Sequence, residues 1–307
     1  MNVLSLFDGM SCGRIALERA GIKVDKYFAS EIDKYAIQIA KKNYPDTIHL
    51  GDVQEVMHPE SFDGHKIDLV IGGSPCQGFS FAGQRLNFDD PRSKLFFEYA
   101  RLIKECNPKY FLLENVRMKQ ECQDVISDIL GVYPIAINSN LVSAQNRYRL
   151  YWTNIPFDGQ PEDKGLLLKH ILENGVVDRD KSHCLDANYF KGGNLKSYFE
   201  KNRRQLVFSE EGLCHIGDAD INGHDCIKRV YHAEGKAPTM NACTGGNREP
   251  KVAINDKKWR KLTPLECERL QTVPDGYTVG VSNTQRYKML GNGWTVDVIA
   301  HIFKGIE

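Results

Sequence analysis

A cysteine directly follows a proline at a point where a buried strand is expected to end. The run from Ile67 to Gly73 is largely apolar and closes with two glycines, which predicts a short strand followed by a turn. Pro75 disfavours a helical conformation at Ser74, so the chain leaves the strand as a loop. Cys76 would then lie at the carboxyl edge of a parallel sheet, where open α/β folds bind their ligands. Its thiol could be a nucleophile, or a buried structural cysteine, and the local pattern leaves both interpretations open.

Glu114 places a carboxyl group near the end of a second apolar strand, which is expected from Tyr110 to Val116. Burying a carboxylate is costly unless it is paired, so this position needs a reason. As an acid beside a thiolate, Glu114 could help to add a nucleophile to a polarised heterocycle. A structural salt bridge is the competing interpretation.

Three long polar side chains alternate at Gln145, Arg147 and Arg149, at the entry to another expected strand. In an extended segment alternate residues share one side, so the three would face the same way. This arrangement suits an anionic or carbonyl-bearing substrate. An exposed edge strand would show the same pattern, and without further context it is the favoured interpretation.

The turn Phe-Asp-Gly-Met-Ser-Cys-Gly, from Phe7 to Gly13, lies between the first expected strand and the first expected helix. Glycines here let the backbone pass close to a ligand at a helix N-terminus, although the absence of Gly-x-Gly-x-x-Gly weakens a dinucleotide interpretation. Glu31 and Asp52 end the next two strands, where they could accept hydrogen bonds from ribose hydroxyls and an adenine amine. Either acid alone is more simply a solvated one. Together, the three strand ends indicate an adenosyl ligand.

The first 155 residues alternate between short apolar runs and amphipathic stretches, which predicts a mostly parallel, doubly wound α/β sheet covered by helices on both faces. The expected strands are Val3 to Phe7, Lys26 to Glu31, Thr47 to Leu50, Ile67 to Gly73, Tyr110 to Val116 and Arg149 to Ile155. The expected helices are Arg14 to Ala20, Tyr35 to Asn43, Leu95 to Cys106 and Val125 to Leu130.

Beyond Pro156 the pattern weakens, with an amphipathic helix expected only from Lys164 to Glu173. Regularity returns at Thr263, followed by Pro264 and Glu266, a capping box that predicts a helix to about Gln271. Thr295 to Phe303 predicts a final helix. We therefore expect a catalytic and cofactor-binding domain over 1–157, a smaller irregular domain over 158–280, and a segment over 281–307 that returns to the first domain.

The 307 residues carry a net charge of zero, which by itself argues against a nucleic-acid partner. Two basic runs weaken that argument. Residues 191–205 contain five Lys or Arg and one acidic residue, and residues 248–261 contain six Lys or Arg and two acidic residues. Such runs are more often solvated faces, yet they permit a surface that binds a phosphate backbone.

The nine cysteines form no Cys-x-x-Cys pair, which disfavours both a disulfide framework and a common zinc spacing. His183-Cys184, Cys214-His215 and His224-x-Cys226 could converge on a metal, but their spacing matches no familiar zinc site, and no metal is expected. The apolar runs are short and the first residues lack a signal-peptide pattern, so a cytosolic location is expected.

Seven short motifs occur in one order along nearly the whole chain. They are Phe-x-Gly at 7–9, Ser-Glu-x-Asp at 30–33, Pro-Cys-Gln at 75–77, Glu-Asn-Val at 114–116, Gln-x-Arg-x-Arg at 145–149, Arg-x-Leu-Thr-x-x-Glu at 260–266 and Gly-Asn at 291–292. In this order they resemble the DNA (cytosine-5) methyltransferase family. Phe-Asp-Gly, Gly-Gly-Ser-Pro-Cys and Gly-Asn-Gly-Trp-Thr-Val look most like the branch of the animal de novo enzymes, whereas the compact length resembles bacterial or phage enzymes.

The resemblance implies a mechanism for the catalytic residues. Cys76, as a thiolate favoured by Arg147 or Arg149, would attack C6 of a cytosine flipped out of double-stranded DNA. Glu114 would hold N3 and the exocyclic amine, and Arg149 the base carbonyl or its phosphate, with Gln145 and Arg147 organising the pocket. Carbon C5 would take its methyl group from S-adenosylmethionine, and loss of the C5 proton would release the enzyme.

The resemblance also implies binding residues. Those expected at the cofactor are Phe7, Asp8, Gly9, Glu31, Ile32, Asp52, Val53, Pro75, Asn292 and Trp294. Ser80 and Arg92 match positions that grip DNA phosphates on a mobile loop, and 158–280 would be the target-recognition domain. Within that domain Gly245, Gly246 and Arg248 belong to the candidate groove-facing loop, for which a plain surface turn is the alternative.

The chain departs from the family pattern at two places. Ser11-Cys12 stands where two glycines are usual, and Gly293-Trp294 follows the late Gly-Asn where a small residue and a valine are commoner. Both lie at the expected cofactor pocket, so its detailed contacts stay open.

Other functions remain to be weighed against this one. A tRNA cytosine-5 methyltransferase shares these motifs, and a catalytically silent DNA-binding relative is a further alternative. A nicotinamide oxidoreductase would account for the first turn but not for Pro-Cys-Gln with Glu-Asn-Val. Double-stranded DNA is the expected partner and a monomer the expected state; a cognate restriction endonuclease, phage self-protection and regulation are open alternatives for the biological role.

Overall fold

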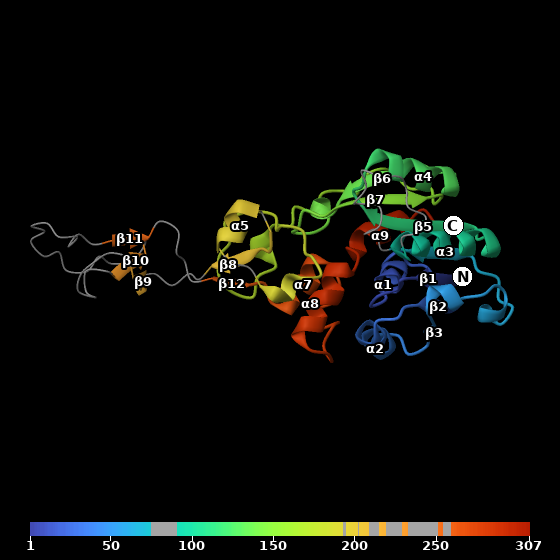
Figure 1. Ribbon diagram of the computed structural model, residues 1–307, viewed down its shortest axis with the longest axis horizontal. Helices are drawn as coiled ribbons and strands as arrows, with labels where there is room; N and C mark the ends of the chain where they lie inside the picture. Colours follow the sequence, from blue (N-terminus) through green and yellow to red (C-terminus); the bar gives the residue numbers. More distant parts are fainter. Residues whose placement is uncertain are drawn as a thin grey trace, which may run out of the picture.

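The computed structural model describes residues 1–74, 91–192, 195–201, 203–208, 215–218, 229–232, 251–253 and 259–307. Its main feature is a seven-stranded sheet with the order β3-β2-β1-β4-β5-β7-β6 (Figure 1). The strands are β1 (Asn2–Leu6), β2 (Lys26–Ser30), β3 (Ile48–Gly51), β4 (Leu69–Gly72), β5 (Tyr110–Val116), β6 (Ile135–Asn138) and β7 (Tyr148–Thr153).

Strands β1 to β5 are parallel, and β7 runs antiparallel to both β5 and β6. The chain moves outward from β1 to β3 and then returns to add β4 on the other side of β1. The switch point therefore lies between β1 and β4, and open α/β sheets bind ligands beyond the carboxyl ends of the strands at such a point.

Two hydrophobic clusters cover the two faces of the sheet. Alternation along β1 sends Val3 to one face and Leu4 and Leu6 to the other. The first face packs against α1 (Cys12–Arg19), α2 (Lys34–Asn43) and α9 (Val296–Phe303), and the second against α3 (Pro91–Cys106) and α4 (Gln120–Leu130). The predicted doubly wound α/β fold is confirmed.

Most predicted strands and helices of the first 155 residues are present, with ends shifted by a few residues. Three elements differ from the prediction. The sequence did not indicate β6, which is short and partly exposed, or α8 (Asn283–Asn292), whose apolar periodicity is weak. The prediction of a helix from Lys164 to Glu173 is wrong. Only a single 3-10 turn, Leu168–His170, forms there, because Gly165 takes a positive φ of 62°.

Beyond β7 the described chain forms short elements. Strands β8 (Leu206–Phe208) and β12 (Trp259–Lys261) pair beside α5 (Leu195–Lys201), and β9 (His215–Asp218), β10 (Arg229–His232) and β11 (Lys251–Ala253) form a separate sheet (Figure 1). Leu168, Leu185 and Leu262 belong to the same hydrophobic cluster as α1 and α9, so part of this region shares the main core. None of the helices in the described ranges is long and apolar enough to span a membrane.

The start of α7 (Pro264–Leu270) confirms the predicted capping box. The Thr263 side chain accepts from the Glu266 backbone N–H, and Glu266 accepts from the Thr263 backbone N–H. Glu266 is fully buried, and both of its oxygens also accept from the Arg260 guanidinium at 2.8 Å. The Arg-x-Leu-Thr-x-x-Glu motif thus joins β12 to α7 and is structural.

Replacing Arg260 by alanine should leave the Glu266 carboxylate buried without its counter-charge. We expect the free energy of unfolding to fall by about 3 kcal/mol, measured by equilibrium urea denaturation. Arg203→Ala breaks an exposed ion pair with Asp186 and is the matched control, expected to cost less than about 1 kcal/mol. Equal losses in the two variants would contradict this interpretation of the motif.

Candidate active site

A cavity of about 760 Å³ opens at the carboxyl ends of β1 to β5. Its walls bring together residues that are far apart in the sequence: Phe7, Asp8 and Gly9 after β1, Glu31 and Ile32 after β2, Asp52 and Val53 after β3, Gly73 and Ser74 after β4, Glu114 of β5, Arg147, Arg149, Asn292 and Trp294. Nine predicted cofactor residues and three predicted catalytic residues therefore share one cavity.

The first turn bends sharply beneath this cavity. Phe7, Gly9 and Ser11 all take the left-handed conformation, with φ of 58°, 60° and 64°. For Phe7 this region is unusual and costs about 1 kcal/mol or more, so the surrounding contacts must hold it. The Asp8 N–H donates to the Ser30 carbonyl at 3.1 Å, which ties the turn to the end of β2.

Glu31 is oriented by backbone donors. One carboxylate oxygen accepts from the Gly9 N–H, and the other accepts from the N–H groups of Ile32 and Asp33, each at 2.8 Å. Asp52 accepts from the Gln54 N–H at 3.0 Å. Ile32 is 74% exposed and lines the same cavity, so it presents an apolar surface between the two acids. Two fixed acceptors flanking an apolar face suit a sugar and a heterocycle.

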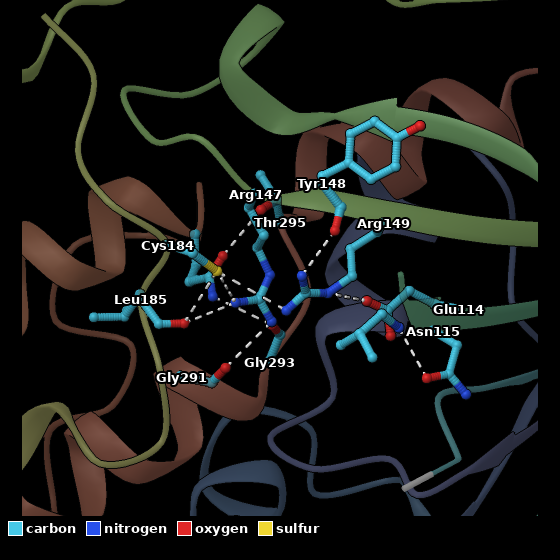
Figure 2. A network of polar contacts seen from close by, with 12 residues as sticks. Glu114, Asn115, Arg147, Tyr148, Arg149, Cys184, Leu185, Gly291, Gly293 and Thr295 are labelled. Carbon is cyan, nitrogen blue, oxygen red and sulfur yellow. Dashed lines mark hydrogen bonds and ion pairs between the residues drawn. The ribbon is translucent and has the colours of Figure 1, made fainter. Parts of the chain in front are cut away.

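Glu114 pairs with Arg149 across two strands. In the antiparallel register of β5 and β7, Arg149 lies opposite Val116, so Glu114 is its diagonal neighbour on the same face. The Arg149 Nε atom lies 2.9 Å from a Glu114 carboxylate oxygen, and both side chains are largely buried (Figure 2). Burial opposes the charge on Arg149, but the carboxylate of Glu114 raises the pKa of Arg149 overall. The salt-bridge interpretation of Glu114 is correct, and its partner is itself a predicted site residue.

Arg147 points away from Glu114 and holds three backbone segments together. Its guanidinium donates to the carbonyls of Leu185, Gly291 and Gly293 at 2.9, 3.2 and 2.9 Å (Figure 2). The side chain is buried, and burial together with the like charge of Arg149 lowers the pKa of Arg147. Arg147 therefore shapes the cavity wall through the C-terminal end of α8.

Gln145 is completely buried and contributes to the same junction from the other side. Its amide donates to the Leu270 carbonyl at 2.7 Å and to the Gln271 side chain at 2.9 Å. Gln145 does not line the cavity, whereas Arg149 does. Gln145 and Arg147 thus brace the wall, and Arg149 is the residue of the three that contacts Glu114.

Trp294 and Cys12, the two departures from the family pattern, lie at the cavity. A side chain on Gly73 would approach the Trp294 indole nitrogen to 3.0 Å and a Glu114 carboxylate oxygen to 3.1 Å. Only glycine therefore leaves both groups in place. Burial raises the pKa of the Cys12 thiol to about 12, so Cys12 is a neutral part of the wall.

Some predicted residues cannot be placed. Pro75, Cys76, Ser80, Gly245, Gly246 and Arg248 lie outside the described residues. Arg92 belongs to α3, but its side chain is not described. Of the His and Cys residues that were considered as metal ligands and disfavoured, the side chains of His183 and Cys184 are described, and within the described ranges no three His, Cys, Asp or Glu side chains are arranged to hold a metal ion.

The sequence interpretation missed the contribution of α8 to the cavity. Gln285, Lys288 and Met289 line it together with Asn292. Lys288 also pairs with Asp33 at 2.7 Å. Lys288, Met289 and Asn292 follow Gln285 by three, four and seven residues, a spacing that places side chains on one face of a helix. The sequence therefore contained this pattern, but it could be recognised only once Asn292 was assigned to a helix.

A comparison with protein families identifies the chain. The model of the C-5 cytosine-specific DNA methylase family matches residues 1–129 and 136–307. The chain belongs to this family. It is 32% identical over 320 residues to the type II methyltransferase M1.ScrFI of Lactococcus lactis subsp. cremoris, covering 97% of this chain and 75% of that protein. It is 26% identical over 434 residues to the orphan methyltransferase M.SPBetaI of Bacillus phage SPbeta, covering 99% and 97%.

The solved structure of the Entamoeba histolytica methyltransferase EhMeth has the same fold, with a TM-score of 0.70, 18% identity and coverage of 100% of this chain and 99% of that chain. The protein is a DNA (cytosine-5) methyltransferase that uses S-adenosylmethionine. This activity was predicted from the order of the motifs and is confirmed.

The methyltransferase cavity fits this cofactor. Glu31 and Asp52 keep free lone pairs that can accept from ribose hydroxyls and an adenine amine, and Ile32 and Val53 offer apolar contact between them. Gly9 and Gly73 line the same cavity as Glu31 and Glu114, and neither adds a side chain to it. Glu31, Asp52, Ile32 and Val53 would therefore hold an adenosyl group.

Arg147→Lys keeps the charge but cannot reproduce the planar fork that reaches three carbonyls. We expect the free energy of unfolding to fall by about 2 kcal/mol, measured by urea denaturation, since buried carbonyls lose charge-assisted hydrogen bonds. Arg149→Lys is the matched control, because an ammonium group can still contact Glu114, and its loss should be smaller. A loss in Arg147→Lys no larger than in Arg149→Lys would refute the bracing role.

Proposed function

We propose that the methyltransferase acts through Cys76 as a nucleophile on C6 of a cytosine flipped out of double-stranded DNA. The observation that carries the proposal is the pairing of Glu114 with Arg149 at the inner end of the cofactor cavity. Cys76 lies outside the described residues, but Ser74, two residues earlier in the sequence, lines the same cavity. Ser74, the last described residue before Cys76, thus shares the cavity with the acid and the guanidinium.

In this mechanism each group has a separate task. The thiolate of Cys76 forms a bond to C6, and Glu114 stabilises the ring at N3 and the exocyclic amine while its aromaticity is lost. Arg149 neutralises Glu114 and offers the rest of its fork to the base carbonyl or a phosphate. When bound, S-adenosylmethionine supplies an electrophilic methyl group. After C5 is methylated its proton leaves to a base, and the bond between C6 and the Cys76 sulfur breaks.

Specificity would be provided by the region after β7. We assign 158–280 to target recognition, with the basic runs at 191–205 and 248–261 as the surface that meets phosphates. Ser80 and Arg92 would grip the DNA backbone, and the loop containing Gly245, Gly246 and Arg248 would face the groove. The motifs Phe-Asp-Gly and Gly-Asn-Gly-Trp-Thr-Val favour the branch of the de novo enzymes.

The biological role is proposed from the relatives. M1.ScrFI is described as a type II methyltransferase and M.SPBetaI as an orphan one, so either a cognate restriction endonuclease or self-protection of a phage genome is consistent with this chain. We propose that it acts as a monomer in the cytosol of a bacterial or phage-infected cell. Bisulfite sequencing of DNA from cells expressing the protein tests the substrate. A recurring methylated context supports the proposal, and unmodified DNA with methylated tRNA overturns it.

Cys76→Ala should abolish methyl transfer to DNA and leave S-adenosylmethionine binding within about twofold, because the thiol reacts but does not hold the cofactor. Transfer is measured with a radiolabelled methyl group and binding by calorimetry. Cys106→Ala, a buried cysteine at the end of α3, is the matched control and should keep its activity. Methyl transfer to DNA by Cys76→Ala would contradict the mechanism.

Glu114→Gln should lower kcat on the order of 10²-fold or more, since the amide cannot supply the acid chemistry of a carboxyl group. Its size and position are otherwise kept, so KM for DNA should change little. Single-turnover kinetics with saturating DNA separate the two effects. A change confined to KM would assign Glu114 to substrate binding alone.

A further inference from the structure

Asp8 is a buried carboxylate at the floor of the cofactor cavity. It lies two residues after the end of β1, is 9% exposed and lines the cavity. One carboxylate oxygen accepts from the Ser11 hydroxyl at 2.6 Å, and the other from the Tyr27 hydroxyl at 2.8 Å. The group is therefore held in place by neutral donors.

No cation compensates this charge within the described residues. No salt bridge joins Asp8 to a lysine, arginine or histidine there, and the nearby Arg14 is stacked 5.1 Å over the Tyr27 ring and paired with Asp46 at 2.7 Å. The titratable groups that face Asp8 are Tyr27 and Glu31 of the β2 side, Cys12 of α1, and Tyr277.

Burial is the largest influence on the pKa of Asp8. Burial raises the pKa of Asp8 to about 6, although the hydroxyls of Ser11, Ser5 and Tyr27 oppose the rise and Glu31 adds to it. Burial also raises the pKa of Tyr27, Cys12 and Tyr277, so these neighbours stay neutral and add no negative charge beside Asp8.

The position of Asp8 at the edge of the sheet suggests which group supplies the missing positive charge. Strand β1 lies between β2 and β4. The acceptor Glu31 follows β2, and Gly73 follows β4. The part of the cofactor between its ribose and its reacting methyl group is the sulfonium. We propose that Asp8 is a fixed counter-charge for this sulfonium and that it makes the enzyme favour the cofactor over its demethylated product, S-adenosylhomocysteine, whose sulfur is neutral.

The proposal rests on the assignment of the cavity to S-adenosylmethionine and deepens it. It also predicts a pH dependence. As the pH falls through about 6, Asp8 takes up a proton in the free enzyme and its counter-charge is lost. Affinity for the cofactor should then fall, whereas affinity for the product should change less at this group.

Calorimetry of the full chain without DNA tests the proposal independently of methyl transfer. Dissociation constants for S-adenosylmethionine and S-adenosylhomocysteine are measured from pH 5 to pH 8. At pH 8 we expect Asp8→Asn to lower the preference for cofactor over product by about tenfold, the effect of removing one partly buried charge a few ångströms away. In the unsubstituted protein the preference should fall toward that of Asp8→Asn below pH 6.

Two further variants keep the test decisive. Asp33→Asn removes another cavity acid, but one already paired with Lys288, and should leave the preference unchanged. Tyr27→Phe removes a hydrogen bond that lowers the pKa of Asp8, so the fall in preference should move to higher pH. If Asp8→Asn does not fold, as judged by circular dichroism, the pH profiles of the unsubstituted protein and Tyr27→Phe decide. A preference independent of pH, or equal weakening of both ligands in Asp8→Asn, would overturn the proposal.

Discussion

The buried guanidinium of Arg147 is the contact on which the site depends. It lies at the entry to β7 and donates to carbonyls at Leu185, Gly291 and Gly293, so three segments distant in the sequence meet around one planar cation. An unpaired backbone carbonyl in such a place would cost free energy, and a planar fork can satisfy several at once. The position of the C-terminal end of α8, and with it Asn292 and Trp294, follows from this contact.

Charge in the cavity is arranged in two zones. Acidic groups gather at the ends of β1, β2 and β3, where Asp8, Glu31 and Asp52 lie, and the guanidinium of Arg149 lies beside Glu114 at β5. The first zone suits hydroxyl, amine and sulfonium groups, and the second suits a base and its phosphate. A parallel sheet produces this separation because each strand delivers one side chain to a common edge.

Much of the fold and the site could be predicted because each depends on local patterns. Apolar runs bounded by glycine located the central strands, and the capping box at Thr263 located the start of α7. Strand β6 and helix α8 could not be found in this way, since β6 is partly exposed and α8 has little apolar periodicity. The helix expected at 164–173 failed for the opposite reason, because its residues are periodic but the backbone leaves the helical conformation at Gly165 and is extended at Leu167.

The sequence by itself determined which chemical groups are available and in what order, and this was enough to identify a cytosine methyltransferase. Only the tertiary structure decided how the alternating residues divide their work. Gln145 and Arg147 turn into the packed junction with 270–271 and 291–293, whereas Arg149 reaches Glu114 across the antiparallel pair of β5 and β7. Alternation places side chains on one face of a strand, but what each one meets there depends on other segments, which for Gln145 and Arg147 lie more than a hundred residues away.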